Sequence, residues 1–207
     1  MAKLESNFKN MVLALFLVTF VASGALGFVY ELTKEPIRMV EINNINNAIS
    51  NIIPEYNNNP YEDMFKVATE KDSLVFYPAT LNGETIGMAV ETWTMKGFTG
   101  LIKLMVGFDM EGKIIDIVVL KHAETPGLGD KIKKDKSDFS LQFIGQDPAT
   151  FKLSVTKDNG DVDAITASTI TSRAYCDAVQ RAYDKFMETA LQHTSTPAHQ
   201  HTNSPAQ

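Results

Sequence analysis

The first strong pattern along the chain is an uninterrupted apolar run near its start. Residues 10–30 contain no charged side chain, and large apolar residues fall on every face that a helix would present. At about 1.5 Å per residue, roughly 20 such residues cross a hydrocarbon core about 30 Å thick. The run therefore predicts a retained transmembrane helix at residues 10–30, preceded by a short segment at residues 1–9.

Two alternatives to a membrane anchor are weaker. The small residues at positions 22–25 would suit a cleavable signal peptide, but the apolar part of such a peptide is only about 7–15 residues long. A buried core helix would normally show one polar face. Lys3 and Lys9 before the run balance Lys34 and Arg38 after it, so the positive charges leave the orientation open.

A second helical pattern follows the apolar run. Ile37, Ile42, Ile45, Ile49 and Ile52 recur at mostly three or four residues, which is typical of an amphipathic helix. We expect this helix at about residues 36–52, with a proline in its first turn and its end before the proline at position 54. Residues 31–65 are thus expected to form an amphipathic helix and a connector.

The middle of the chain is rich in β-branched residues and contains two turn signals. Asn82-Gly83 and Glu111-Gly112 each separate two strand patterns, and each predicts a hairpin. The run at residues 114–120 is almost continuously apolar, so we expect it to be a central strand. Successive hairpins favour a largely antiparallel sheet flanked by helices, an α+β fold. The four predicted strands are residues 74–81, 85–94, 101–108 and 113–120.

The remaining patterns complete one domain at residues 66–191. Short strands are expected at 139–143 and 153–155, and a helix with one apolar stripe at about 172–191. Residues 192–207 are rich in His, Thr, Pro and Gln without apolar periodicity, so we expect a disordered tail.

Composition excludes several classes of function. The net charge of −6 gives no electrostatic support for nucleic-acid binding. The one cysteine, Cys176, excludes an intrachain disulfide framework and a cysteine-rich metal site or iron–sulfur cluster held by this chain alone. We expect Cys176 to be a small core residue of the last helix. No glycine-rich nucleotide loop is present.

The first candidate functional stretch is residues 163–173, where hydroxyls and small side chains precede the last helix. A helix that begins just after them would aim free N–H groups and its positive dipole end at the stretch, which favours a phosphate group. The alternative is an ordinary helix N-cap, because Ser and Thr are common caps. The hydroxyl residues are Thr166, Ser168, Thr169, Thr171 and Ser172.

The second candidate stretch is residues 122–130, where a proline and two glycines after a strand predict a shaped loop. The alternative is a plain connecting turn. His122 and Glu124 could begin a metal site, but no third ligand follows at a suitable spacing, so we predict no metal here.

The first stretch resembles the flavinylation motif of the FMN-binding domain family, Asp-x-x-(Ser/Thr)-Gly-Ala-(Ser/Thr)-x-(Ser/Thr). In that family the FMN phosphate is esterified to the hydroxyl at the seventh position, and the resemblance implies that Thr169 is this residue. Ala167 and Ser168 stand where the consensus has Gly and Ala, and both are still small. The matching positions are Asp163, Thr166, Ala167, Ser168, Thr169 and Thr171.

The second stretch resembles another signature of the same family, Glu-Thr-Pro-Gly-Leu-Gly. In family members this segment lies beside the flavin. The resemblance implies that its residues line the isoalloxazine site, with backbone amides reaching the polar edge of the ring. These residues are Glu124, Thr125, Pro126, Gly127, Leu128 and Gly129.

The order of anchor, loop and C-terminal motif is similar to that in the G subunit of the Rnf electron-transport complex. This resemblance implies an electron-transfer subunit with covalently bound FMN, a redox part of an ion-translocating ferredoxin:NAD oxidoreductase complex and not a complete enzyme alone. It places residues 1–9 in the cytoplasm and the soluble domain on the periplasmic side of the inner membrane, with membrane lipid and the other complex subunits as partners. The alternatives are the C subunit of the sodium-translocating NADH:quinone reductase, which usually carries longer insertions, and an anchored non-redox scaffold.

Threonine is a poor nucleophile unaided, and the sequence offers no obvious base beside Thr169. We therefore expect a separate flavin transferase to make the bond, with Asp163 helping that enzyme to recognise the site. Further hypotheses rest on position alone. Lysines could offset the charge of the flavin, aromatic residues could pack near its ring, and an arginine could pair with its phosphate. A solvated charge run and core packing are the better explanations of the first two. These residues are Lys131, Lys133, Lys134, Trp93, Phe98 and Arg173.

Overall fold

The computed structural model describes residues 7–69 and 72–195, and it divides into two units, residues 1–44 and residues 45–207. Helix α1 (Phe8–Ile52) begins in the first unit, where its side chains are exposed on all sides. It is long and apolar enough to cross a membrane, as the apolar run predicts. The helix continues through Pro36, so the prediction that Pro36 begins a separate helix is wrong. Proline removes one backbone hydrogen bond there, and the flanking turns retain theirs.

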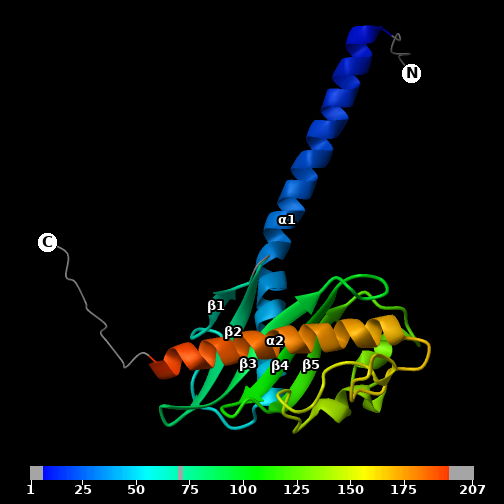
Figure 1. The fold of residues 1–207 in the computed structure, drawn as a ribbon. Helices are drawn as coiled ribbons and strands as arrows, with labels where there is room; N and C mark the ends of the chain where they lie inside the picture. Colours follow the sequence, from blue (N-terminus) through cyan, green and yellow to red (C-terminus); the bar gives the residue numbers. More distant parts are fainter. Residues whose placement is uncertain (1–6, 70–71, 196–207) are drawn as a thin grey trace, which may run out of the picture. The chain divides into compact units, whose positions relative to one another are not determined.

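The second unit is built on one antiparallel sheet (Figure 1). Its strands lie in sequence order, so each pairs with the strands before and after it along the chain. The predicted hairpin around Asn82-Gly83 is confirmed, and both turn residues have positive φ (54° and 87°), as this tight turn requires. The α+β class is therefore confirmed. The strands are β1 (Phe65–Ala68), β2 (Ser73–Leu81), β3 (Glu84–Thr94), β4 (Ile102–Asp109) and β5 (Ile114–His122).

Alternate side chains of each strand point to opposite sides of the sheet, and both of these faces are covered. Helix α2 (Thr169–Ser195) crosses one face, where Phe76, Val90 and Phe108 belong to the larger core (Figure 1). The last turns of α1 cover the other face through Ile49 and Ile52. Residues 45–52 are therefore part of the folded domain, although they share a helix with the apolar run.

The prediction that residues 114–120 form a central strand is wrong, because β5 is the last strand of the sheet. Its apolar side chains reflect coverage on both faces: Ile117 joins the core under α2, while Val118 packs with the residues of α1. The outer edge of β5 is partly closed by two backbone hydrogen bonds, from Ile114 N–H to the Gln146 carbonyl (2.9 Å) and from Gly145 N–H to the Ile114 carbonyl (2.7 Å). An apolar run thus indicates two buried faces and does not identify the inner strands.

The connecting segments differ most from the sequence-based expectations. Residues 139–143 lie in a 3-10 helix, η2 (Asp138–Phe143), capped by Ser137, so the predicted strand there is wrong. The predicted strand at 153–155 is reduced to one bridge between Val155 and Val162. Strand β1 was not predicted. Two further 3-10 helices are η1 (Gly129–Ile132) and η3 (Thr156–Asp158).

Helix α2 confirms the predicted C-terminal helix and is longer than expected at both ends. It begins at Thr169, three residues before the expected start, so the candidate acceptor is the first helical residue. It continues to Ser195, so the first residues of the predicted disordered tail are helical; residues 196–207 lie outside the described part of the chain.

Candidate functional site

Two segments far apart in the sequence line one pocket of about 330 Å³. One is the loop that follows β5, and the other is the turn that leads into α2. A side chain from the loop between β3 and β4 completes the wall. The residues around the pocket are Phe98, Glu124, Thr125, Leu128, Gly129, Ala167, Ser168, Thr169, Ile170 and Thr171.

The turn into α2 presents backbone donors to this pocket. Ala167 has a positive φ of 63°, which bends the chain sharply just before the helix begins at Thr169. In the described part of the chain, the N–H groups of Thr169, Ile170 and Thr171 have no hydrogen-bond acceptor. Free amides and the positive end of the helix dipole together favour an anionic group at this position.

The hydroxyls of this turn have different surroundings, and these single out Thr169. The Ser172 hydroxyl is buried, accepts a hydrogen bond from Ile165 N–H (3.0 Å) and donates to the Ser168 carbonyl (3.0 Å). The Thr171 hydroxyl is also buried and donates to Glu124 Oε2 at 2.7 Å. Ser168 and Thr169 both line the pocket, and neither hydroxyl makes a hydrogen bond with the described residues, but Ser168 is buried (7% exposed) whereas Thr169 is half-buried. It is therefore available for a covalent or hydrogen-bonded ligand.

Glu124 joins the walls of the pocket. Its side chain is only 4% exposed, and both carboxylate oxygens accept hydrogen bonds: Oε1 from Thr99 N–H (3.2 Å) and Oε2 from the Thr171 hydroxyl (2.7 Å). A Cβ atom at Gly97 would lie 2.4 Å from Oε1, and one at Gly129 would lie 2.4 Å from Oε2. Glycine at both positions thus lets two loops close on the carboxylate.

The loop after β5 uses part of its backbone to hold its own shape. The Thr125 carbonyl accepts from the N–H groups of Leu128 (3.2 Å) and Asp130 (3.4 Å), and Gly127 has a positive φ of 78°. Pro126 and Gly127 are exposed and do not line the pocket. The amide of Leu128 therefore already has an acceptor within the loop, whereas its exposed side chain forms part of the pocket wall.

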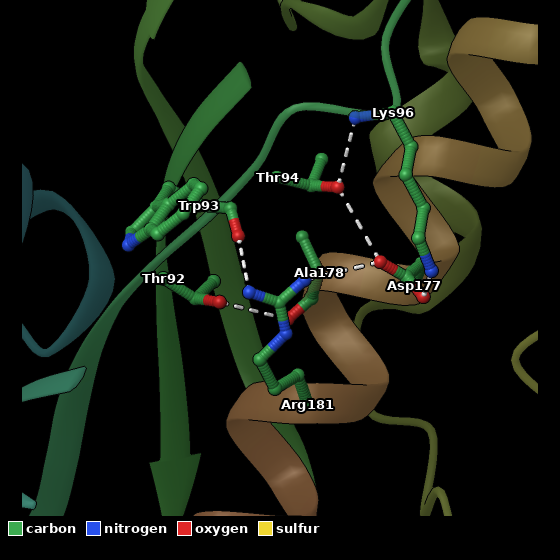
Figure 2. A network of polar contacts seen from close by, with 7 residues as sticks. All are labelled: Thr92, Trp93, Thr94, Lys96, Asp177, Ala178 and Arg181. Carbon is green, nitrogen blue, oxygen red and sulfur yellow. Dashed lines mark hydrogen bonds and ion pairs between the residues drawn. The ribbon is translucent and has the colours of Figure 1, made fainter. Parts of the chain in front are cut away.

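A polar network fixes the loop between β3 and β4 onto α2 (Figure 2). Asp177 accepts from Lys96 Nζ (2.6 Å), from Arg181 Nη2 (3.1 Å) and from the Thr94 hydroxyl (3.4 Å). Arg181 Nη1 also donates to the carbonyl of Trp93 at 2.7 Å. Burial alone would raise the pKa of Asp177, but Lys96 and Arg181 together hold this pKa below its ordinary value. The same helix thus positions both the turn at Thr169 and the loop that carries Phe98.

Asp163 and Thr166 do not reach the pocket that Thr169 lines. Both belong to a separate, shallower depression beside η2, and both are exposed. The backbone of Asp163 is fixed by Gln142, which accepts from its N–H (2.8 Å) and donates to its carbonyl (3.1 Å). The carboxylate of Asp163 makes no hydrogen bond or ion pair with the described residues. It faces outward, where another molecule can reach it.

Of the six residues proposed on position alone, only Phe98 lines the pocket. Arg173 forms a two-point ion pair with Asp158 (2.7 and 2.8 Å), which holds the pKa of that carboxyl below its usual range, so the hypothesis that Arg173 pairs with a bound phosphate is not supported. The ring of Trp93 lies beneath the guanidinium of Arg181, 5.8 Å from it. Lys134 pairs with Asp116.

The remaining lysines of that group, Lys131 and Lys133, lie outside the pocket. Cys176 is buried, as expected, and burial raises the pKa of its thiol to about 12, which makes it unreactive.

A larger cavity of about 660 Å³ lies along α2, but its charged side chains already have partners within the protein. Most of its charged residues pair with one another, as Arg173 does with Asp158 and Arg181 with Asp177, and Asp184 accepts a hydrogen bond from Gln180. The smaller pocket instead combines unused donors with an apolar wall, so it is the better candidate site.

Sequence reasoning missed three residues of the site: Gly97, Thr99 and Ile170. Gly97 and Thr99 lie between the two predicted hairpins, and only the fold reveals that they close on Glu124. Ile170 follows Thr169 directly and is exposed at the pocket. The signal available in the sequence was an isoleucine among the hydroxyl residues of this stretch.

The pocket suits a ligand that has an anionic group at one end and a flat apolar part. The anion fits the free amides at the start of α2. The apolar part fits between the exposed side chains of Phe98, Leu128 and Ile170. The volume is at the low end of the roughly 300–1,000 Å³ typical of small-molecule sites, so such a ligand would remain partly exposed.

Comparisons with known proteins point to the same ligand. Residues 97–184 match the family described as FMN-binding domain, and this range contains every residue that lines the pocket. The chain is 34% identical over 194 residues to the G subunit of the ion-translocating oxidoreductase complex of Shewanella piezotolerans, covering 89% of this chain and 91% of that protein. The G subunit of Vibrio atlanticus is 34% identical, with coverages of 84% and 86%. The G subunit of Vibrio cholerae is 35% identical, with coverages of 84% and 87%.

Proposed function

The chain belongs to the family of G subunits of ion-translocating oxidoreductase complexes, and from this we propose that it carries FMN as a phosphoester on Thr169 and relays electrons within such a complex. FMN supplies the redox chemistry when bound, and the protein supplies its position and electrostatic surroundings. The three relatives named above are described as G subunits, so the alternatives of a quinone-reductase C subunit and a non-redox scaffold are not favoured.

The observation that carries the proposal is the position of the Thr169 hydroxyl. Among the hydroxyl residues of this turn, Thr169 is the one that lines the pocket and is partly exposed, and its hydroxyl has no hydrogen-bond partner among the described residues. The free amides at the start of α2 would hold the phosphate, and Phe98, Leu128 and Ile170 would contact the ring. A phosphoester at this point fixes the cofactor without altering its ring.

Attachment requires help from a second protein. A threonine hydroxyl needs an activating base, and the nearest buried carboxylate, Glu124, already accepts from Thr171 and Thr99. We infer that a flavin transferase forms the bond. Asp163 is exposed outside the pocket, which suits recognition by that enzyme better than contact with the bound flavin.

The role of Asp163 has its own test. We expect Asp163→Ala to lower the fraction of chains that carry FMN without changing the unfolding temperature, because the exposed carboxylate makes no hydrogen bond or ion pair with the described residues. Flavin absorbance per protein chain measures the loading. Normal FMN loading of Asp163→Ala would show that Asp163 is not needed for attachment.

The protein is a single-pass membrane protein, and we place its domain outside the cytoplasm. The other subunits of a ferredoxin:NAD oxidoreductase complex and membrane lipid are the expected partners. A tag at the N-terminus should resist protease in intact spheroplasts and be cleaved in broken ones, whereas the domain should be accessible in both. Cleavage of the tag in intact spheroplasts would reverse this orientation.

The proposal is tested by producing the full chain together with a flavin transferase and measuring its intact mass and its fluorescence in a denaturing gel. We expect one FMN per chain, and we expect Thr169→Val to lose the adduct completely while keeping the fold, because valine has nearly the shape of threonine. Thr169→Ser should restore it. Thr166→Val is the matched control, since Thr166 lies outside the pocket. Covalent fluorescence that survives in Thr169→Val would show that another residue is the acceptor.

A further inference from the structure

Glu124 is an unusual feature of the pocket because it is a buried charge without a counter-ion. Among the Asp, Glu, Lys, Arg and His side chains that the structure describes, it is the one that is buried, at 4% exposure. It takes part in no ion pair with the described residues. Buried charges are normally paired, since removing an ion from water is costly.

The hydrogen bonds of Glu124 match an ionised carboxylate. Both oxygens act as acceptors, and the donors are neutral: a backbone N–H of Thr99 and the hydroxyl of Thr171. Neither donor carries a full positive charge, so among the described residues the carboxylate is compensated only by hydrogen bonds and by the partial positive charge at the start of α2, where Thr171 lies. The backbones at Gly97 and Gly129 pack against the carboxylate so closely that no side chain larger than hydrogen fits at either position without displacing it.

A side chain that joins two loops by hydrogen bonds does not need to be charged. Glutamine has the same length, can accept from the Thr99 N–H through its oxygen, and can donate its amide to the Thr171 hydroxyl. The structure therefore provides a negative charge where a neutral side chain could also reach both Thr99 and Thr171. This charge lies in the wall of the pocket assigned to FMN.

We propose that Glu124 lowers the reduction potential of the flavin through a negative charge that no described counter-ion neutralises, in addition to joining its own loop to the β3–β4 loop and to the first turn of α2. The inference rests on the function proposed above. An electron that arrives on the flavin brings a negative charge into the pocket, and Glu124 opposes it. The effect is strong because the pocket wall has a lower dielectric constant than water.

The test is a redox titration of full-length, FMN-loaded protein in detergent, comparing wild type with Glu124→Gln. We expect the variant to favour reduction about tenfold more, which corresponds to a rise of about 59 mV in a one-electron midpoint potential. Glu188→Gln is the matched control: Glu188 is exposed near the far end of α2, roughly 28 Å along the helix from Thr169 at about 1.5 Å per residue. This control should keep the wild-type potential.

A second measurement tests the premise without the flavin. In full-length chains produced without the transferase, Glu124→Gln should raise the midpoint of chemical unfolding, because a buried charge without a counter-ion is replaced by a neutral side chain that can accept from Thr99 and donate to Thr171. A lower midpoint would show that the fold compensates the charge, and this would overturn the proposal. So would a Glu124→Gln potential equal to or below that of the wild type.

FMN attachment and the role of Glu124 are contradicted by different results. Wild-type chains that never acquire FMN would contradict the proposed function itself. Wild-type chains that carry FMN, but whose potential does not respond to Glu124→Gln, would leave that function intact and reject the role of Glu124 alone.

Discussion

Ala167 holds the bend that brings the hydroxyl of Thr169 to the pocket. Its φ of 63° lies in the left-handed region, which costs a residue with a Cβ atom about 1–2 kcal/mol relative to glycine. The structure thus keeps a strained residue directly before its candidate acceptor. The strain is offset by the contacts of the buried residues on either side, Ile165 and Ser168.

At this position glycine should be the more stable residue. We expect Ala167→Gly to raise the free energy of unfolding by about 0.5–1 kcal/mol, since relief of strain exceeds the added entropy of the unfolded chain. Urea unfolding measures the difference. Ala164→Gly is the control, because Ala164 has no positive φ and packs against the core, and it should be destabilising. A less stable Ala167→Gly variant would mean that the bend is not strained.

The residues of the site differed in how far the sequence revealed them. Thr169 and the loop from Glu124 to Gly129 could be identified from motifs because their spacing is local. The pairing of Glu124 with Thr171 joins positions 47 residues apart, and no local pattern encodes it. The assignment of Asp158 as the partner of Arg173 likewise depends on the fold of the segment between them.

Helix α2 organises the site at the level of elements. Its first residue is the candidate acceptor, and its third and fourth turns carry Asp177 and Arg181, which hold the end of β3 (Figure 2). The loop with Phe98 continues directly from this end of β3. One rigid helix therefore sets the distance between the two sides of the pocket.

This attachment should depend on pH through Asp177. Because the pKa of Asp177 is lower in the folded chain than its ordinary value of 3.8, its contribution to stability is complete above that value and is lost as the pH falls through the lower, folded pKa. Asp177→Asn should reduce the free energy of unfolding by about 1 kcal/mol at neutral pH, an amount modest for a charged network because the group is partly exposed.

The difference between wild type and Asp177→Asn should shrink as the pH falls below 3.8, and urea unfolding at several pH values measures it. Asp184→Asn serves as the control: Asp184 is exposed and bonds to Gln180 alone among the described residues, so its removal should change little. A difference between wild type and Asp177→Asn that does not vary with pH would show that Asp177 acts through its shape and not through its charge.

Element prediction succeeded where the pattern was local and failed where tertiary packing decided. The hairpin turns and α2 follow from turn residues and periodicity. The expected strand at residues 139–143 forms a 3-10 helix instead, in which Phe139 and Phe143 both pack on Tyr175 of α2, at centroid distances of 5.3 and 5.2 Å. A strand would place residues four apart on one face as well, so the apolar spacing alone does not distinguish the two.

At the scale of the whole molecule, the boundary between anchor and domain lies inside one helix. The first unit ends at Asn44, and the next turns of α1 supply Ile45, Ile49 and Ile52 to the second core. The sequence pattern showed both the apolar run and the isoleucine repeat. It did not show that one helix joins them, because a proline between two helical patterns normally marks a break.

Two truncations test this boundary. A chain of residues 41–207 should remain folded without detergent and unfold cooperatively. A chain of residues 54–207 should aggregate, because it loses four buried isoleucines and Ala48, and each large side chain contributes about 1.5–3 kcal/mol against a typical total stability of about 5–15 kcal/mol. Circular dichroism during thermal unfolding measures the outcome. A stable, cooperative 54–207 chain would place the end of α1 outside the domain.

The central claim is that a single hydroxyl, that of Thr169, carries FMN. Trypsin cleaves after Lys157 and Arg173, so one peptide contains all five hydroxyls of the turn: Thr166, Ser168, Thr169, Thr171 and Ser172. Fragmentation of this peptide from flavin-loaded, full-length protein assigns the added mass to one residue. We predict that the mass of FMN lies on Thr169. Its location on any other hydroxyl, or an unmodified peptide from protein that retains flavin, would contradict the account.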